Sequence, residues 1–238
     1  MNRILAVSPH LDDAVFSAGG TLAAHVMAGD TVRVVTCFTG NVEHPAGFAL
    51  ACQLDKGLGA EIDYMALRRK EDIAACGAIG AEAVHWPFLE APHRGYDNAR
   101  ALFQTPLLHD DVADDIANAL EAQIAAFAPD RIYGPFGVGR HVDHIAVRRA
   151  MEVCGYKGHV LLWEDYPYAM RETVPPPSIV RRTLAPESFA SKRNATLAYT
   201  SQLGFQFGGD AEARAALCDW RVEGFAPLRR ENAANHSQ

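Results

Sequence analysis

The feature that most constrains this chain is a polar segment, Ser8-Pro9-His10-Leu11-Asp12-Asp13, placed directly after a short apolar run. The run Ile4-Leu5-Ala6-Val7 has the length and composition of a buried strand. Open α/β sheets carry their sites at the carboxyl ends of such strands. One imidazole and two carboxylates offer a divalent metal two ligands and leave one carboxylate as a general base. The carboxylates can equally cap the following helix, so this segment alone leaves both interpretations open.

Alternating strand-like and helix-like segments predict an α/β fold, a single Rossmann-like, doubly wound domain with a mostly parallel sheet. With 238 residues, of which 49% are hydrophobic, the chain suffices for one substantial core. We expect this domain over residues 1–229 and a frayed tail over 230–238. The expected strands are 4–7, 31–38, 83–86, 131–135 and 159–163, with 178–183 at an edge. The expected helices are about 14–27, 68–80, 111–127, 145–153, 188–199 and 210–220. Gly19 and Gly20 interrupt the first helix, which indicates a close packing partner.

Composition excludes several classes of partner. The formal net charge is −7 and no Lys/Arg run exceeds three residues, so we expect no nucleic acid partner. The first apolar run is only four residues long, too short for a signal-peptide core, and no stretch approaches the roughly 20 apolar residues of a membrane helix. We therefore expect a cytoplasmic protein without a membrane partner; an oligomer remains possible. The five cysteines include no CxxC pair, which argues against a disulfide framework and a thiolate zinc site.

A second polar motif, His141-Val142-Asp143-His144, follows the strand expected at 131–135. His141 and His144 are spaced i, i+3, so they share one face if the segment is helical. Together with His10 and Asp13 they can supply a His-Asp-His ligand set with an open position, the pattern of a catalytic Zn²⁺ site. The motif therefore favours metal ligation over capping.

The expected chemistry is hydrolysis of an amide or ester. Zinc lowers the pKa of a bound water toward about 7, and a carboxylate that is not a ligand, here Asp12, can accept the proton. His141, as an imidazolium, can stabilise the tetrahedral oxyanion. Asp143 can fix the orientation and protonation of His141, as carboxylates beside metal sites commonly do.

Three motifs, P-H-L-D-D at 9–13, R-R-K-E-D at 68–72 and G-R-H-V-D-H at 139–144, resemble the PIG-L/LmbE-type family of zinc-dependent N-acetylglucosamine deacetylases. The resemblance spans about residues 1–205. It implies that Asp12 is the general base, that His141 helps stabilise the oxyanion and that Arg68 lies at the sugar. The implied zinc ligands are His10, Asp13 and His144. Two positions depart from the family's P-H-P-D-D-E, with Leu11 for proline and Ala14 for glutamate. The implied substrate is an amino sugar or glycoconjugate whose identity the family does not fix.

Residues for substrate specificity are less clearly marked. Glu164 and Asp165 follow the strand expected at 159–163, at the same sheet edge, and we expect them to contact substrate. The aromatic candidates are Trp86, Tyr96, Trp163, Tyr166 and Tyr168, of which the two tryptophans are as readily explained as core. Four residues match a C-terminal family pattern without an evident role: Lys192, Tyr199, Ser201 and Gln202.

Two rival functions remain at this point. A Mg²⁺-dependent phosphatase with Asp12 as nucleophile leaves His10 and His144 unused and needs an all-oxygen metal site. A non-catalytic glycan- or nucleotide-binding protein on the same fold is weakened because no G-x-G-x-x-G follows the first strand. A serine hydrolase is poorly supported because no G-x-S-x-G occurs.

Overall fold

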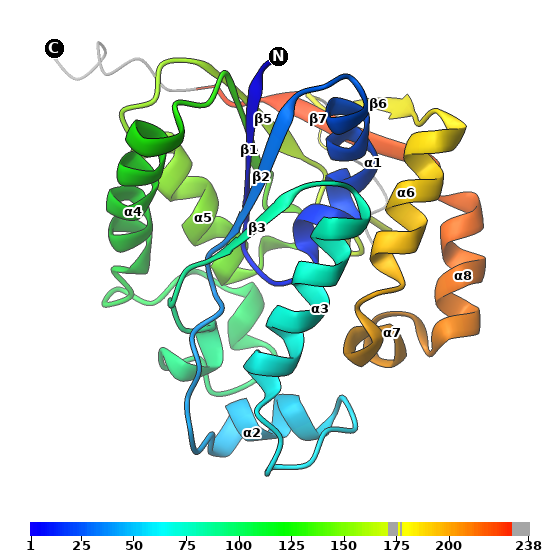
Figure 1. Cartoon of the computed structure of the whole chain (residues 1–238). Helices are drawn as coiled ribbons and strands as arrows, with labels where there is room; N and C mark the ends of the chain where they lie inside the picture. The colour runs from blue at the N-terminus through cyan, green and yellow to red at the C-terminus, as the bar shows by residue number, and fades with distance from the viewer. Residues whose placement is uncertain (171–175, 177, 230–238) are drawn as a thin grey trace, which may run out of the picture.

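The computed structural model describes residues 1–170, 176 and 178–229, and these form a seven-stranded sheet with helices on both faces (Figure 1). The strand order is β3-β2-β1-β4-β5-β7-β6. The first five strands are parallel, whereas β7 pairs antiparallel with both β5 and β6. The strands are β1 (Arg3–Ser8), β2 (Thr31–Thr36), β3 (Glu82–His85), β4 (Arg131–Pro135), β5 (His159–Trp163), β6 (Val180–Thr183) and β7 (Val222–Pro227). The predicted α/β class and mostly parallel sheet are confirmed.

Eight α-helices occur within the described residues. They are α1 (Asp13–Met27), α2 (Gly47–Leu54), α3 (Tyr64–Ala78), α4 (Val112–Phe127), α5 (Val142–Val153), α6 (Pro186–Thr196), α7 (Thr200–Phe207) and α8 (Asp210–Asp219). Short 3-10 turns include Ala91–His93, Ala101–Phe103, Val138–Arg140 and Tyr168–Met170. None of the helices described is long and apolar enough to span a membrane.

Strand β1 is buried on both faces, which explains its unbroken apolar run. Ile4 and Ala6 belong to the core cluster shared with α1, α3 and α6, whereas Leu5 and Val7 belong to the cluster shared with α4 and α5. Successive side chains of a strand point to opposite faces. All four are at most 1% exposed, so the sheet is covered on both sides around β1.

Three elements were not predicted. The segment 41–63 contains α2, the C-terminal region contains α7 between the two helices that we expected there, and β7 forms beyond the second of them. Strand β7 carries Glu223 and Gly224 in its interior, which obscures a strand pattern. The edge position predicted for 178–183 is confirmed, since β6 ends the sheet beyond β7. The tail 230–238 lies outside the described residues.

The glycine pair in α1 has the close partner that its sequence indicated. A Cβ on Gly20 would meet the side chain of Leu184, and one on Gly19 would lie 3.4 Å from Cγ of Lys192. Lys192 is fully buried, and its Nζ donates to Oε1 of Glu223 at 2.8 Å. Glu223 also accepts hydrogen bonds from the backbone N–H groups of Gly20 and Thr21. Lys192 therefore joins α6, β7 and the glycine turn of α1.

Helix α3 is held to the C-terminal helices by the acidic end of the R-R-K-E-D motif. Glu71 accepts hydrogen bonds from the hydroxyl groups of Thr200 and Ser201 at 2.8 and 2.6 Å. Asp72 accepts one from the hydroxyl of Tyr199 at 2.6 Å. These contacts give the C-terminal motif a structural role, since they position the helix that carries Arg68.

Replacing Lys192 by methionine is expected to lower the free energy of unfolding by about 3 kcal/mol, because it breaks a buried ion pair from one side. The measurement is urea denaturation at pH 7. The matched control is Glu152→Gln, which removes the half-buried helical pair with Arg148 and is expected to cost about 0.5 kcal/mol or less. Equal losses in the two variants would contradict the structural role of Lys192.

Candidate active site

The two polar motifs meet at the carboxyl edge of the sheet. Strands β1 and β4 are parallel neighbours, so their carboxyl ends lie side by side. The segment after β1 carries His10, Asp12 and Asp13, and the start of α5, just beyond β4, carries His141 and His144. The ring centroids of His10 and His144 lie 5.3 Å apart. Residues more than 130 positions apart thus form one cluster.

Asp13 lies between two imidazoles. Its Oδ2 is 3.1 Å from Nδ1 of His10 and 3.2 Å from Nε2 of His144. The ligating atoms of these three residues all lie within 4.8 Å of one another. Nε2 of His144 is buried and makes no hydrogen bond. An unsatisfied buried nitrogen facing a carboxylate and a second imidazole fits a metal ligand set of two nitrogens and one oxygen.

Each of these histidines is oriented by a second carboxylate. Oδ2 of Asp143 lies 2.8 Å from Nε2 of His10, and Oδ1 of Asp165 lies 2.8 Å from Nδ1 of His144. Carboxylates commonly hold metal-binding histidines in this way, which fixes the ring orientation and directs the other nitrogen to the metal. Here that leaves Nδ1 of His10 and Nε2 of His144 directed at Asp13.

Asp143 differs from its predicted role. Its Oδ2 is 4.0 Å from Nδ1 of His141, too far for a hydrogen bond, so the carboxylate orients His10 and not His141. Its Oδ1 accepts a hydrogen bond from Arg94 at 2.8 Å. Arg94 also binds Asp110. The long loop between β3 and α4 therefore supports the cluster from outside through Arg94. No pattern in the sequence predicted this contact.

Asp165 also differs from its prediction. It was expected to contact substrate, yet it is fully buried. Its Oδ2 accepts hydrogen bonds from the backbone N–H groups of Gly137 and Val138 at 2.7 and 2.8 Å. With Oδ1 held by His144, both oxygens are committed to the protein. The structure therefore places Asp165 behind a candidate metal ligand.

The carboxylate of Asp12 does not cap α1. Asp12 is the residue that precedes the helix, but its side chain makes no capping hydrogen bond. It is 5% exposed, and its Oδ2 lies 3.4 Å from a terminal nitrogen of Arg68. Burial raises the pKa of Asp12 to about 7, although the charge of Arg68 opposes this shift. A carboxylate with such a pKa is suited to accept and release a proton near neutral pH.

His141 is neutral in this arrangement, which corrects the expected imidazolium. Burial lowers the pKa of His141 to about 3. Its Nδ1 accepts a hydrogen bond from the backbone N–H of Asp143 at 3.2 Å. The remaining proton of the neutral ring is then on Nε2, which leaves that N–H as a donor.

Arg68, which was expected to lie at the sugar, contacts Asp12 and also a residue that the sequence analysis missed. One of its terminal nitrogens donates to Oε1 of Glu90 at 2.8 Å. Its Nε is buried and makes no hydrogen bond. Glu90 follows β3 in the irregular segment 87–109, which has no motif to distinguish one acidic residue from another.

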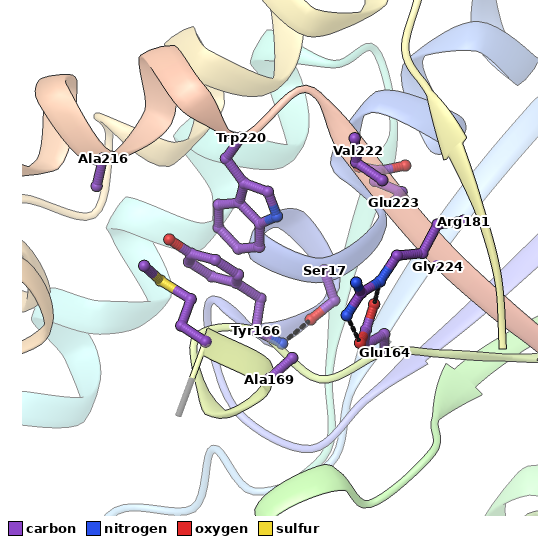
Figure 2. A pocket seen from close by; sticks show the side chains of 11 residues that line it. Ser17, Glu164, Tyr166, Ala169, Arg181, Ala216, Trp220, Val222, Glu223 and Gly224 are labelled. Carbon is purple, nitrogen blue, oxygen red and sulfur yellow. Dashed lines mark hydrogen bonds and ion pairs between the residues drawn. The ribbon is translucent and has the colours of Figure 1, made fainter. Parts of the chain in front are cut away.

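Glu164 lies apart from these residues in a pocket of its own. Figure 2 shows its carboxylate paired with Arg181, at 2.6 Å, in a pocket that Tyr166 and Trp220 also line. No contact links Glu164 to the histidine cluster within the described chain. Its predicted contact with substrate therefore gains no support from its surroundings.

One of the five aromatic candidates contacts the cluster. The ring of Tyr168 lies 5.3 Å from that of His144, and the unpredicted Phe103 lies 5.3 Å from His141. A Cβ on Gly139 would lie 2.9 Å from Tyr168, so glycine is needed for this close approach. Tyr96, Trp163 and Tyr166 are buried in the core, and Trp86 packs beside Phe88.

Comparison with known proteins identifies the fold family. Residues 5–154 match the family model described as GlcNAc-PI de-N-acetylase, PIG-L. The chain belongs to this family. The predicted resemblance is therefore confirmed, over more than half of the sequence.

Two curated relatives and one solved structure show how far the similarity extends. The chain is 34% identical over 193 residues to 2'-N-acetylparomamine deacetylase of Streptomyces fradiae, covering 79% of this chain and 66% of the relative. It is 35% identical over 157 residues to 1D-myo-inositol 2-acetamido-2-deoxy-alpha-D-glucopyranoside deacetylase of Mycobacterium sp. (strain KMS), covering 62% of this chain and 48% of the relative. The zinc-inhibited form of teicoplanin deacetylase Orf2 superposes with a TM-score of 0.83 at 28% identity, covering 98% of this chain and 100% of that one. The chain thus spans about half to two thirds of these curated relatives.

Asp165→Asn is expected to weaken the affinity of this candidate metal site for a divalent ion 10- to 100-fold, as loss of an orienting carboxylate commonly does. An asparagine can keep the contacts of only one of the two carboxylate oxygens. When its amide oxygen accepts a hydrogen bond from His144, its NH₂ group faces the backbone N–H groups of Gly137 and Val138, so donor meets donor. The measurement is Kd by chelator competition. The matched control is the neighbouring Glu164→Gln, which leaves the cluster untouched. Equal Kd values in the two variants would contradict the role of Asp165.

Metal affinity is expected to rise with pH. Burial opposes a charge on His144, but Asp13 and Asp165 outweigh it and raise the pKa of His144 to about 9. At pH 7 the metal-free ring therefore carries a proton that a metal must displace. Affinity should increase roughly 10-fold per pH unit between pH 6 and 8 for each displaced proton. Chelator competition at three pH values tests this, and a flat profile would refute it.

Proposed function

We propose that this protein is a zinc-dependent deacetylase that removes an N-acyl group from an amino sugar or glycoconjugate. The observation that carries the proposal is the His10-Asp13-His144 ligand set with a separate carboxylate, Asp12, beside it. Membership in a family whose matched relatives are named deacetylases supports it.

The residues that would hold the metal are His10 through Nδ1, Asp13 through its carboxylate and His144 through Nε2. Bound there, zinc would act as a Lewis acid and lower the pKa of a coordinated water. The two imidazoles favour Zn²⁺ over Mg²⁺, which prefers oxygen ligands. The donor set therefore disfavours the phosphatase alternative.

Asp12 would act as the general base. It accepts a proton from the water that attacks the amide carbonyl and can return it to the leaving amine. A nearby cation lowers the pKa of a carboxylate, so metal loading should shift the pKa of Asp12 below about 7. The acid limb of the rate profile then lies below neutral pH, where protonation of Asp12 removes the base.

His141 would stabilise the tetrahedral oxyanion by hydrogen bonding. Its Nδ1 is occupied by the backbone N–H of Asp143, so Nε2–H is the available donor. A neutral donor fixed in a buried site stabilises developing negative charge without reorganisation. Phe103 and Tyr168 pack beside the ring of His141 and help to hold it in place.

Arg68 would position the sugar. It is buried, its Nε–H is unpaired, and its terminal nitrogens contact Glu90, Asp12 and the carbonyl of Leu11. A hydroxyl oxygen of the substrate can accept from that N–H. This role suits the sugar substrates named for the relatives, whose amides lie on glycosyl rings.

Two substitutions test the assignment of base and ligand. Asp12→Ala is expected to retain about one zinc per chain and to lose roughly 10²- to 10⁴-fold in kcat, the usual contribution of a general base. His144→Ala is expected to lose metal and activity together. The measurements are metal content by mass spectrometry and acetate release from an N-acetylglucosaminide on the same preparation. Near-normal turnover in Asp12→Ala would overturn the base assignment, and full metal content in His144→Ala would overturn the ligand set.

A further inference from the structure

A cavity of about 290 Å³ lies beside Arg68. We call it the α2 cavity; its walls come from residues 40–65, which include α2 and the start of α3, and from residues 90–93 beyond β3. Figure 1 shows α2 beyond the carboxyl edge of the sheet, the edge that carries the candidate active site. Backbone N–H groups of Cys37 and Phe38 donate to the carbonyl oxygens of Ser8 and Pro9. The segment that leads from β2 into the wall of the cavity therefore runs beside the first motif.

Arg68 connects the α2 cavity to the candidate base. Glu90 and Tyr64 line the cavity, and both contact Arg68: Glu90 by a hydrogen bond of 2.8 Å, and Tyr64 through its ring, 5.4 Å from the guanidinium carbon. On its other side, Arg68 lies 3.4 Å from Asp12. Nε of Arg68, the residue that contacts both the cavity wall and Asp12, is buried and unpaired, so it can donate to an acceptor atom of a ligand.

The walls of the α2 cavity are acidic. Four carboxylates line it, Glu43, Glu61, Asp63 and Glu90, and none of its lining residues is lysine or arginine. Two histidines, His44 and His93, also line the cavity, and burial lowers the pKa of His93, which disfavours a positive charge on that ring. The nearby Lys56 donates to the carbonyl of Cys52 and lies over the Tyr64 ring.

Two of these carboxylates are available to a ligand. Oδ1 of Asp63 caps α3 through the N–H of Ala66, and Glu90 is paired with Arg68. Within the described part of the chain, Glu43 and Glu61 make no hydrogen bond or ion pair with another residue. Their negative charge can therefore act on whatever enters the cavity.

We propose that the α2 cavity is the subsite for the part of the substrate beyond the acetylated sugar, and that it selects a ring bearing amino groups. The inference rests on the proposed deacetylase function and adds the chemical class of the aglycone. A volume near the lower end of ligand pockets, about 300 Å³, suits one further ring. Ammonium groups on that ring match the free carboxylates, whereas a neutral polyol gains no charge pairing and a phosphate is repelled.

The test compares two glucosaminides of equal size, one of a diaminocyclitol and one of myo-inositol, by calorimetric binding to the zinc-loaded protein at pH 7. The diaminocyclitol compound is expected to bind about 10-fold more tightly, as two partly exposed charge pairs would give. The preference should shrink in 0.5 M salt. Equal affinities, or no binding of either compound, would overturn the proposal.

The double variant Glu43→Gln with Glu61→Gln is expected to bring the affinity ratio close to 1. The matched control, Asp114→Asn with Asp115→Asn, removes two exposed carboxylates from the first turn of α4 and should retain the ratio. An unchanged ratio in the α2-cavity variant would overturn the proposal.

Binding and hydrolysis separate the two proposals. The hydrolysis test uses the N-acetylated forms of the same two glucosaminides. Acetate release from both at the same kcat/KM would refute the proposed subsite and keep the proposed deacetylase function. A charge-dependent binding preference without acetate release from either would keep the subsite and refute the deacetylase.

Discussion

The cluster depends on a buried carboxylate held between two imidazoles. Oδ2 of Asp13 lies 3.1 Å from His10 and 3.2 Å from His144. Removing such groups from water is costly unless each charge is compensated. Two further carboxylates, Asp143 and Asp165, provide that compensation from outside, and each fixes which nitrogen its histidine presents. The surrounding structure serves to keep these contacts aligned.

The sheet order makes this alignment possible. With β1 between β2 and β4, and β5 next to β4, the carboxyl ends of four parallel strands adjoin. The end of β1 supplies His10 and Asp13, the segment after β4 supplies the α5 histidines, and the segment after β5 supplies Asp165. Helix α3 adds Arg68 and is itself anchored to α7 through Glu71. The candidate site residues thus lie on packed strands and helices or on the short segments that directly join them.

The candidate metal cluster and the proposed α2-cavity subsite occupy different parts of the same sheet edge. The histidine cluster is enclosed, whereas the segment around α2 projects beyond the sheet and carries exposed acidic side chains. Arg68 lies between the two regions and touches a residue of each, Asp12 and Glu90. This division would allow the residues around α2, which are proposed to bind the rest of the substrate, to vary without changing the candidate metal ligands.

Local patterns in the sequence were sufficient for the α/β class, for most strands and helices, and for the two motifs that meet in the cluster. They were insufficient wherever a contact joins distant segments. Asp143 was assigned to His141, its neighbour in sequence, but it binds His10, and Asp165 was assigned to substrate but binds His144. The strand β7, inserted between β5 and β6, also had no local signature.

By itself, the sequence determined which residue types stand at the ends of which strands, because hydrophobic period and turn residues act over a few positions. Only the tertiary structure decided which carboxylate orients which histidine, that His141 is neutral, and that Glu90 and Arg94 support the site. The physical reason is that these properties depend on burial and on distances across the sheet, and both arise only when strand ends far apart in sequence become neighbours.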